Sequence, residues 1–123
     1  MRLTTLGKFV IKHQYSVEGY VTFRMHVISG NFYGVSNFCI SERLLEEATS
    51  TLSIMCNNCK GTHRMNDYDS DDFILFTFKN HGRICISGQI GGSHRQQWLR
   101  YQFITDQTGL GIIISDFQGL IPK

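Results

Sequence analysis

Cysteine and histidine come together at one place in this 123-residue sequence, where Cys56-Asn57-Asn58-Cys59 is followed by His63. A Cys-x2-Cys pair with a histidine four residues on could supply three zinc ligands. A structural zinc site needs a fourth ligand, and no second Cys or His pair follows nearby. A redox role is disfavoured because redox CxxC motifs usually follow a strand, whereas this pair follows an expected helix. The alternative is two small thiols at a helix end, so we predict neither a bound metal nor a cofactor.

The histidines offer a second kind of chemistry. A general acid–base pair, for example His26 with His94, could be assembled by folding. No serine or cysteine near any histidine belongs to a recognisable nucleophile motif, and ordinary surface or turn histidines explain the pattern equally well. The sequence therefore predicts a protein that is not an enzyme. The histidines are His13, His26, His63, His81 and His94.

A cluster of acidic residues follows the CxxC segment. The spacing does not match a calcium-binding EF-hand loop, because no glutamate follows at the required position. A local negative surface on a slightly basic protein is suited to a basic protein partner, since complementary charge steers association. The alternative is an ordinary solvated loop. The predicted partner-binding residues of this cluster are Asp67, Tyr68, Asp69, Asp71 and Asp72.

Trp98 and Arg100 form the other predicted binding element. Leu99, Tyr101 and Phe103 alternate with polar residues, so Trp98 and Arg100 belong to the opposite face of the expected strand. An exposed Trp beside an Arg is typical of a binding hot spot, and it could also stack a nucleic-acid base. The alternative is that a helix covers that face. A net charge of +2 is too weak to predict nucleic-acid binding by charge alone, so we do not expect a nucleic-acid partner.

Period-two alternation predicts three strands in the first third of the chain and three more after residue 72, and a 3.6-residue period predicts a helix between these two groups. Ser41 can cap that helix, which begins at Glu42 and ends near Met55. Residues 56–72 have no regular period, and we expect a loop there. The expected strands lie at residues 8–15, 20–29, 32–40, 73–79, 83–88 and 98–103.

The last strand leads into a second helix. Asp106-Gln107-Thr108 is a polar break in which Asp106 or Thr108 can cap the helix. After the break, Leu110, Ile113, Ile114, Phe117 and Ile121 fall on one helical face. A final strand at residues 112–114 is the alternative, because β-branched residues have weak helix propensity.

These elements predict an α+β fold, in which a curved, mostly antiparallel sheet of about six strands is packed by two helices. The length fits a single domain over residues 1–123. Open sheet edges make a weak homodimer conceivable, and otherwise we expect a monomer. No apolar run is long enough to span a bilayer and no signal-peptide pattern is present, so we expect a cytoplasmic protein with reduced cysteines.

The second half of the sequence resembles WapI-type immunity proteins of bacterial polymorphic, or contact-dependent, toxin systems. The matching residues are His81-Gly82, Ser87-Gly88, Tyr101, Phe103, Asp106-Gln107-Thr108 and Leu110, within residues 73–121. The resemblance implies a cytoplasmic protein that binds and neutralises a cognate toxin domain, often a nuclease. The alternative is a small nucleic-acid-binding or regulatory module that uses a sheet face with Trp98 and arginines.

Overall fold

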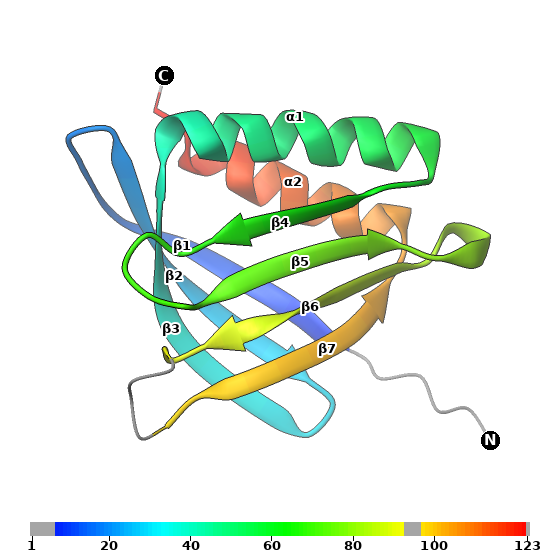
Figure 1. The fold of residues 1–123 in the computed structure, drawn as a ribbon, viewed down its shortest axis with the longest axis horizontal. Coiled ribbons are helices and arrows are strands. Elements are labelled where there is room, and N and C mark those ends of the chain that lie inside the picture. Colours follow the sequence, from blue (N-terminus) through cyan, green and yellow to red (C-terminus); the bar gives the residue numbers. More distant parts are fainter. Residues whose placement is uncertain (1–6, 93–96, 123) are drawn as a thin grey trace.

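The computed structural model describes residues 7–92 and 97–122, which form two antiparallel sheets with two helices packed against both (Figure 1). Sheet A has the strand order β1-β2-β3 and sheet B has the order β4-β5-β6-β7. The elements are β1 (Gly7–Val17), β2 (Tyr20–Ser29), β3 (Phe32–Ser41), α1 (Glu42–Asn58), β4 (Thr62–Asn66), β5 (Phe73–Phe78), a 3-10 turn (Asn80–Gly82), β6 (Ile84–Ile90), β7 (Leu99–Thr105) and α2 (Gln107–Leu120).

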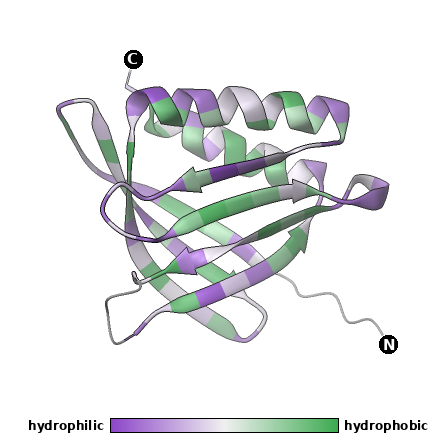
Figure 2. Cartoon of the chain, in the orientation of Figure 1, coloured by the Kyte–Doolittle hydropathy of each residue, from purple (hydrophilic) through white to green (hydrophobic). Residues whose placement is uncertain are grey.

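The sheets pack inner face to inner face, and phenylalanines fill the space between them. Phe23 on β2 lies 5.3 Å from Phe38 on β3 and 5.8 Å from Phe117 on α2, measured between ring centres. Phe76 and Phe103 contribute from sheet B, and all five rings are almost fully buried. Hydrophobic and hydrophilic residues alternate along β7, as Figure 2 shows, and buried positions alternate with half-buried ones along β5. One buried face per sheet follows from that alternation.

The two helices begin where the sequence predicts. Ser41 caps α1 by accepting a hydrogen bond from the Leu44 main-chain N–H (3.1 Å), and Asp106 caps α2 by accepting one from Gly109 (2.9 Å). Each capping side chain accepts a hydrogen bond from a main-chain N–H that has no partner within the helix, and this stabilises the helix by about 1 kcal/mol. Helix α1 packs against β3 and β4, and α2 packs against β1 and β7. Neither helix in the described part of the chain is long and apolar enough to cross a membrane.

The structure confirms the α+β class, the two helices and the antiparallel strand pairing. It differs in having two sheets where one was expected, and a seventh strand. That strand, β4, lies inside the segment predicted to be a loop, where Met65 turns inward and is buried while Arg64 is exposed. The alternative strand at residues 112–114 is wrong, because Ile113 and Ile114 bury their side chains as part of α2.

Candidate functional site

The acidic loop, residues 67–72, is held in place by its own first aspartate. Asp67 Oδ1 accepts a hydrogen bond from the Cys39 main-chain N–H (2.7 Å), and Asp67 Oδ2 accepts one from the Ser70 hydroxyl (2.6 Å). The Tyr68 N–H donates to the Cys39 carbonyl (2.8 Å). The loop therefore continues the hydrogen bonding of sheet A at the edge of β3.

The last aspartate of the loop fixes the turn that follows β6. The Asp72 carboxyl accepts hydrogen bonds from the main-chain N–H groups of Gly91 (3.1 Å) and Gly92 (2.8 Å) and from Gln89 Nε2 (3.2 Å). Asp72 is only 3% exposed, and Asp67 is 9% exposed. Both carboxyl groups bind main-chain donors inside the protein, so these two of the predicted site residues support the loop from within.

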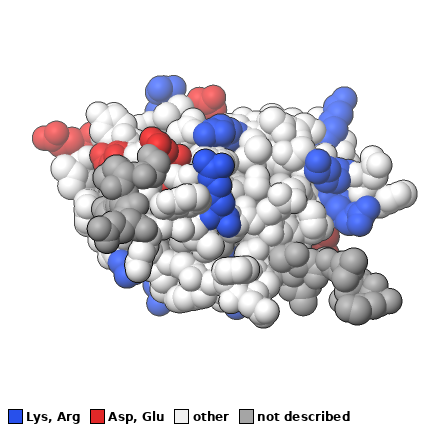
Figure 3. Space-filling view, turned by 60° about the horizontal axis from the view of Figure 1, so that its bottom comes forward, with Lys and Arg blue, Asp and Glu red and all other residues white. Residues whose placement is uncertain are grey.

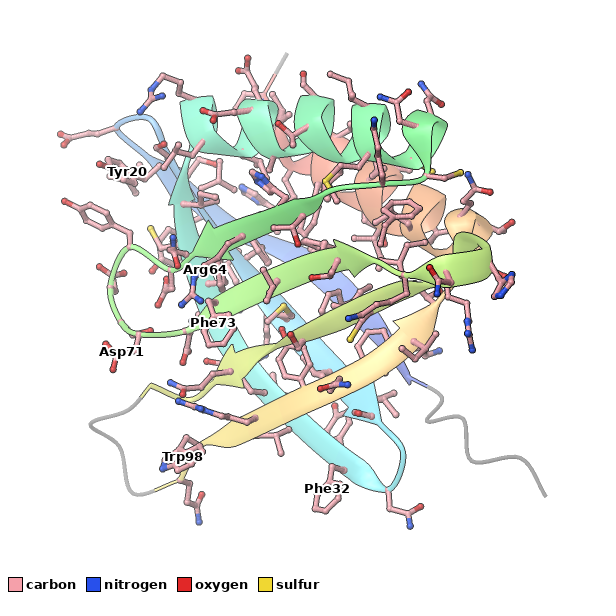
Figure 4. All side chains as sticks on the ribbon, turned by 45° about the vertical axis from the view of Figure 1, so that its right-hand side comes forward. Tyr20, Phe32, Arg64, Asp71, Phe73 and Trp98 are labelled. Atoms are coloured by element: carbon pink, nitrogen blue, oxygen red, sulfur yellow. The ribbon has the colours of Figure 1, made fainter. Side chains whose placement is uncertain are left out.

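The remaining predicted residues of the loop face outward. Tyr68, Asp69 and Asp71 are exposed, and Figure 4 shows Asp71 on the outer side of the loop. The Tyr68 ring lies 4.6 Å from the Tyr20 ring at the start of β2. A hydrogen bond with Tyr68, and the negative charge that Tyr68 carries once it is ionised, raise the pKa of Tyr20. The loop thus presents an aromatic ring and two carboxylates from a backbone that is anchored at both ends.

A groove of about 1240 Å³ lies next to this loop, over the outer face of β2 and β3. Its lining includes Asp69 from the acidic loop, and Trp98 and Leu99 from the start of the β7 segment. The groove therefore brings the two predicted binding elements together around one space that carries both signs of charge. Its floor includes Thr22 and Arg24 from β2 and Asn37 and Cys39 from β3.

Cys39 is a groove residue that the sequence analysis did not select. Burial raises the pKa of its thiol, and the charges of Asp69 and Asp67 raise that pKa further, while a hydrogen bond with Thr22 lowers it. A raised pKa keeps the thiol protonated at neutral pH, which disfavours reaction as a nucleophile. Cys39 is a site residue only because it lies beside the acidic loop. That proximity depends on its contact with Asp67, which is 28 residues away in the chain.

Trp98 and Arg100 lie together, as the alternation predicted. The Arg100 guanidinium carbon lies 5.8 Å from the centre of the Trp98 ring, and Trp98 is 54% exposed. Arg100 Nε donates to Gln89 Oε1 (3.1 Å), and the amide nitrogen of Gln89 donates to Asp72. Gln89, which is buried, therefore connects Arg100 to the acidic loop. Gln89 was not predicted as a site residue, because its partners become neighbours only in the folded protein.

The cysteines and histidines do not assemble into a metal site within residues 7–92 and 97–122, where no group of three His, Cys, Asp or Glu side chains could hold a metal ion. Cys59 ends α1 with a left-handed backbone conformation (φ 54°), and its sulfur accepts a hydrogen bond from Gln107 Nε2 (3.0 Å). His63 lies half-buried on β4, while the hypothetical pair of His26 with His94 involves a residue outside the described ones. His26 Nδ1 instead lies 2.8 Å from the Tyr33 hydroxyl.

No protein-family model matches this chain, and no curated protein matches it significantly. The resemblance to WapI-type immunity proteins accordingly stays a prediction.

Proposed function

We propose that this protein is a non-enzymatic binding module that captures a partner protein in the groove between the acidic loop and Trp98. The partner is the basic surface of a cognate bacterial toxin domain, such as a nuclease, which the bound module neutralises by covering it. In this proposal Tyr68, Asp69, Asp71 and Trp98 contact the partner, while Asp67 and Asp72 hold the loop in its binding conformation.

The anchoring of the acidic loop is the observation that carries this proposal. Asp67 and Asp72 together accept five hydrogen bonds, three of them from main-chain N–H groups of Cys39, Gly91 and Gly92. A loop that is already ordered loses less conformational entropy when a partner binds, so more of the contact energy appears as affinity.

The composition of the groove also favours a protein partner. Tyr, Trp and Arg are the residues most enriched in interface hot spots; Arg24 and Trp98 line this groove, Tyr68 belongs to the acidic loop at its edge, and Arg100 lies near the Trp98 ring. The exposed carboxylates of Asp69 and Asp71 add charge complementary to a basic partner, which raises the rate of association.

A pull-down from lysate of cells that produce this protein, with and without nuclease treatment, tests the proposal. We expect one stoichiometric protein partner that survives nuclease digestion. When purified, its toxic or enzymatic activity should fall in proportion to added module and reach zero at a one-to-one ratio. Recovery of partners only through nucleic acid, or a partner whose activity is unchanged by saturating module, would refute the proposal.

A further inference from the structure

The outer face of sheet B is a second surface, which meets the groove at Trp98, and neither helix covers it (Figure 1). The strand register places the outward side chains of the four strands in three cross-strand rows. None of these outward positions holds an Asp or Glu. In the view of Figure 3, basic side chains lie near the middle of the molecule and acidic side chains gather toward the left-hand end. The outward residues are Thr62, Arg64, Asn66, Phe73, Leu75, Thr77, Cys85, Ser87, Gln89, Arg100, Gln102 and Ile104.

Two arginines on this face are held in the same way. Arg64 Nε donates to Asn66 Oδ1 (2.8 Å), and the Arg64 guanidinium carbon lies 3.9 Å from the centre of the Phe73 ring, above which it sits in Figure 4. Arg100 Nε donates to the Gln89 amide oxygen, and its guanidinium lies near the Trp98 ring. In both cases a side-chain amide oxygen accepts a hydrogen bond from Nε; the Arg64 guanidinium also lies directly over the Phe73 ring, whereas that of Arg100 is 5.8 Å from the centre of the Trp98 ring. Because these hydrogen bonds use Nε, each guanidinium can present its terminal nitrogens to a phosphate.

The spacing of these cations fits an extended anion. Arg64 is on β4 and Arg100 is on β7, so three strand-to-strand steps and an offset of two residues along the strands separate them, or roughly 16 Å. Trp98, exposed just before β7 and two residues ahead of Arg100, offers a ring face on which an unpaired base can stack. Lys79 and Arg83 are exposed in the turn between β5 and β6, and they extend the positive charge at the opposite end of the face.

We propose that the outer face of sheet B binds single-stranded nucleic acid, with Arg64 and Arg100 contacting phosphates and Trp98 stacking a base. A single strand is favoured over a duplex because stacking on Trp98 requires a base that is not paired. This activity goes beyond protein binding in the groove, and the two proposed surfaces share Trp98.

Fluorescence anisotropy of a labelled 12-nucleotide thymidine oligomer with the full-length protein tests the proposal. We expect binding at about 50 mM salt, and at least tenfold weaker binding by the double variant Arg64→Gln/Arg100→Gln. The slope of log K against log salt should fall by about 1.4 in that variant, because each lost phosphate contact in a single strand contributes about 0.7. The matched control Lys8→Gln/Lys12→Gln removes the same charge from β1, and its affinity should stay within about twofold of the wild type.

The stacking role has its own readout, because Trp98 is the single tryptophan of the chain. Its fluorescence should be quenched as the oligomer binds, and Trp98→Leu should weaken binding at least fivefold. Circular dichroism checks that each variant is folded. The proposal is overturned if the oligomer does not bind at about 50 mM salt, if the control variant loses as much affinity as the arginine variant, or if a poly-glutamate of equal length competes as well as unlabelled oligomer.

Discussion

Replacing Asp72 with alanine should destabilise the protein far more than the same change at the exposed aspartates of the acidic loop, Asp69 and Asp71. The substitution leaves the N–H groups of Gly91 and Gly92, and the amide of Gln89, without their acceptor. An unsatisfied buried donor costs about 1–3 kcal/mol, and partial exposure of the Gly91 turn places the total near 3 kcal/mol. Asp72→Asn retains one acceptor oxygen but turns its amide N–H donors toward the remaining N–H groups. We therefore expect the free energy of unfolding to fall by about 1.5 kcal/mol.

Urea unfolding followed by circular dichroism measures this effect through the midpoint at unchanged m-value. Asp69→Ala is the matched control, because it removes an exposed carboxylate of the same loop and should change the free energy of unfolding by less than about 0.5 kcal/mol. If Asp72→Ala costs less than about 1 kcal/mol, or no more than Asp69→Ala, then the Asp72 hydrogen bonds do not anchor the loop and the reasoning is wrong.

Three further predictions concern the core, the sheet and pH. Phe117→Ala should lower the free energy of unfolding by roughly 3–5 kcal/mol, since this ring is fully buried between α2 and β2, and a loss below about 1 kcal/mol would contradict that packing. Gly88→Ala should destabilise by about 1–3 kcal/mol, because an added Cβ would overlap the Phe73 carbonyl oxygen and the hydroxyl of the buried Tyr101, whereas Gly111→Ala meets no atom on the surface of α2 and should stabilise by about 0.5–1 kcal/mol in the same urea assay. Burial lowers the pKa of His63 below its ordinary 6.5, so the unfolded chain binds the proton more readily and stability should fall as the pH drops below that value. His63→Gln should reduce that dependence in melts at about pH 7 and about pH 5, and an unchanged slope would exclude His63 as its source.

The local elements of this fold are predictable because their signals are local. Ser41 and Asp106 stand where a cap is needed, and the apolar residues after each of them repeat at helical spacing. The arrangement of the sheets is not local. A Cβ on Gly34 would lie 2.5 Å from Ile90 and 3.1 Å from Leu99, so this glycine permits a close approach of β3 to sheet B. The spacing of apolar residues in the sequence does not indicate that β3 approaches sheet B in this way. The division into two sheets was therefore not predicted.

The candidate site was predicted at the level of segments and not at the level of individual roles. All four aspartates of the acidic loop were predicted to bind the partner, whereas Asp67 and Asp72 are buried and Asp69 and Asp71 are exposed. The position of each aspartate within the loop is what distinguishes the buried pair: Asp67 directly follows β4 and Asp72 directly precedes β5. Arg64 was overlooked because β4 was not recognised, and without that strand nothing places Arg64 on the same face as Arg100.

The affinity of the purified partner for charge-reversed module tests the central claim most directly. Asp69→Lys/Asp71→Lys reverses the exposed carboxylates of the acidic loop, and Glu46→Lys/Asp116→Lys makes the same charge change at exposed positions on the two helices. If a basic partner binds in the groove, titration calorimetry should show at least tenfold weaker binding, about 1.4 kcal/mol, for the loop variant and less than twofold change for the helix variant. Equal affinities of the loop variant and the wild type would place the partner elsewhere and contradict the account.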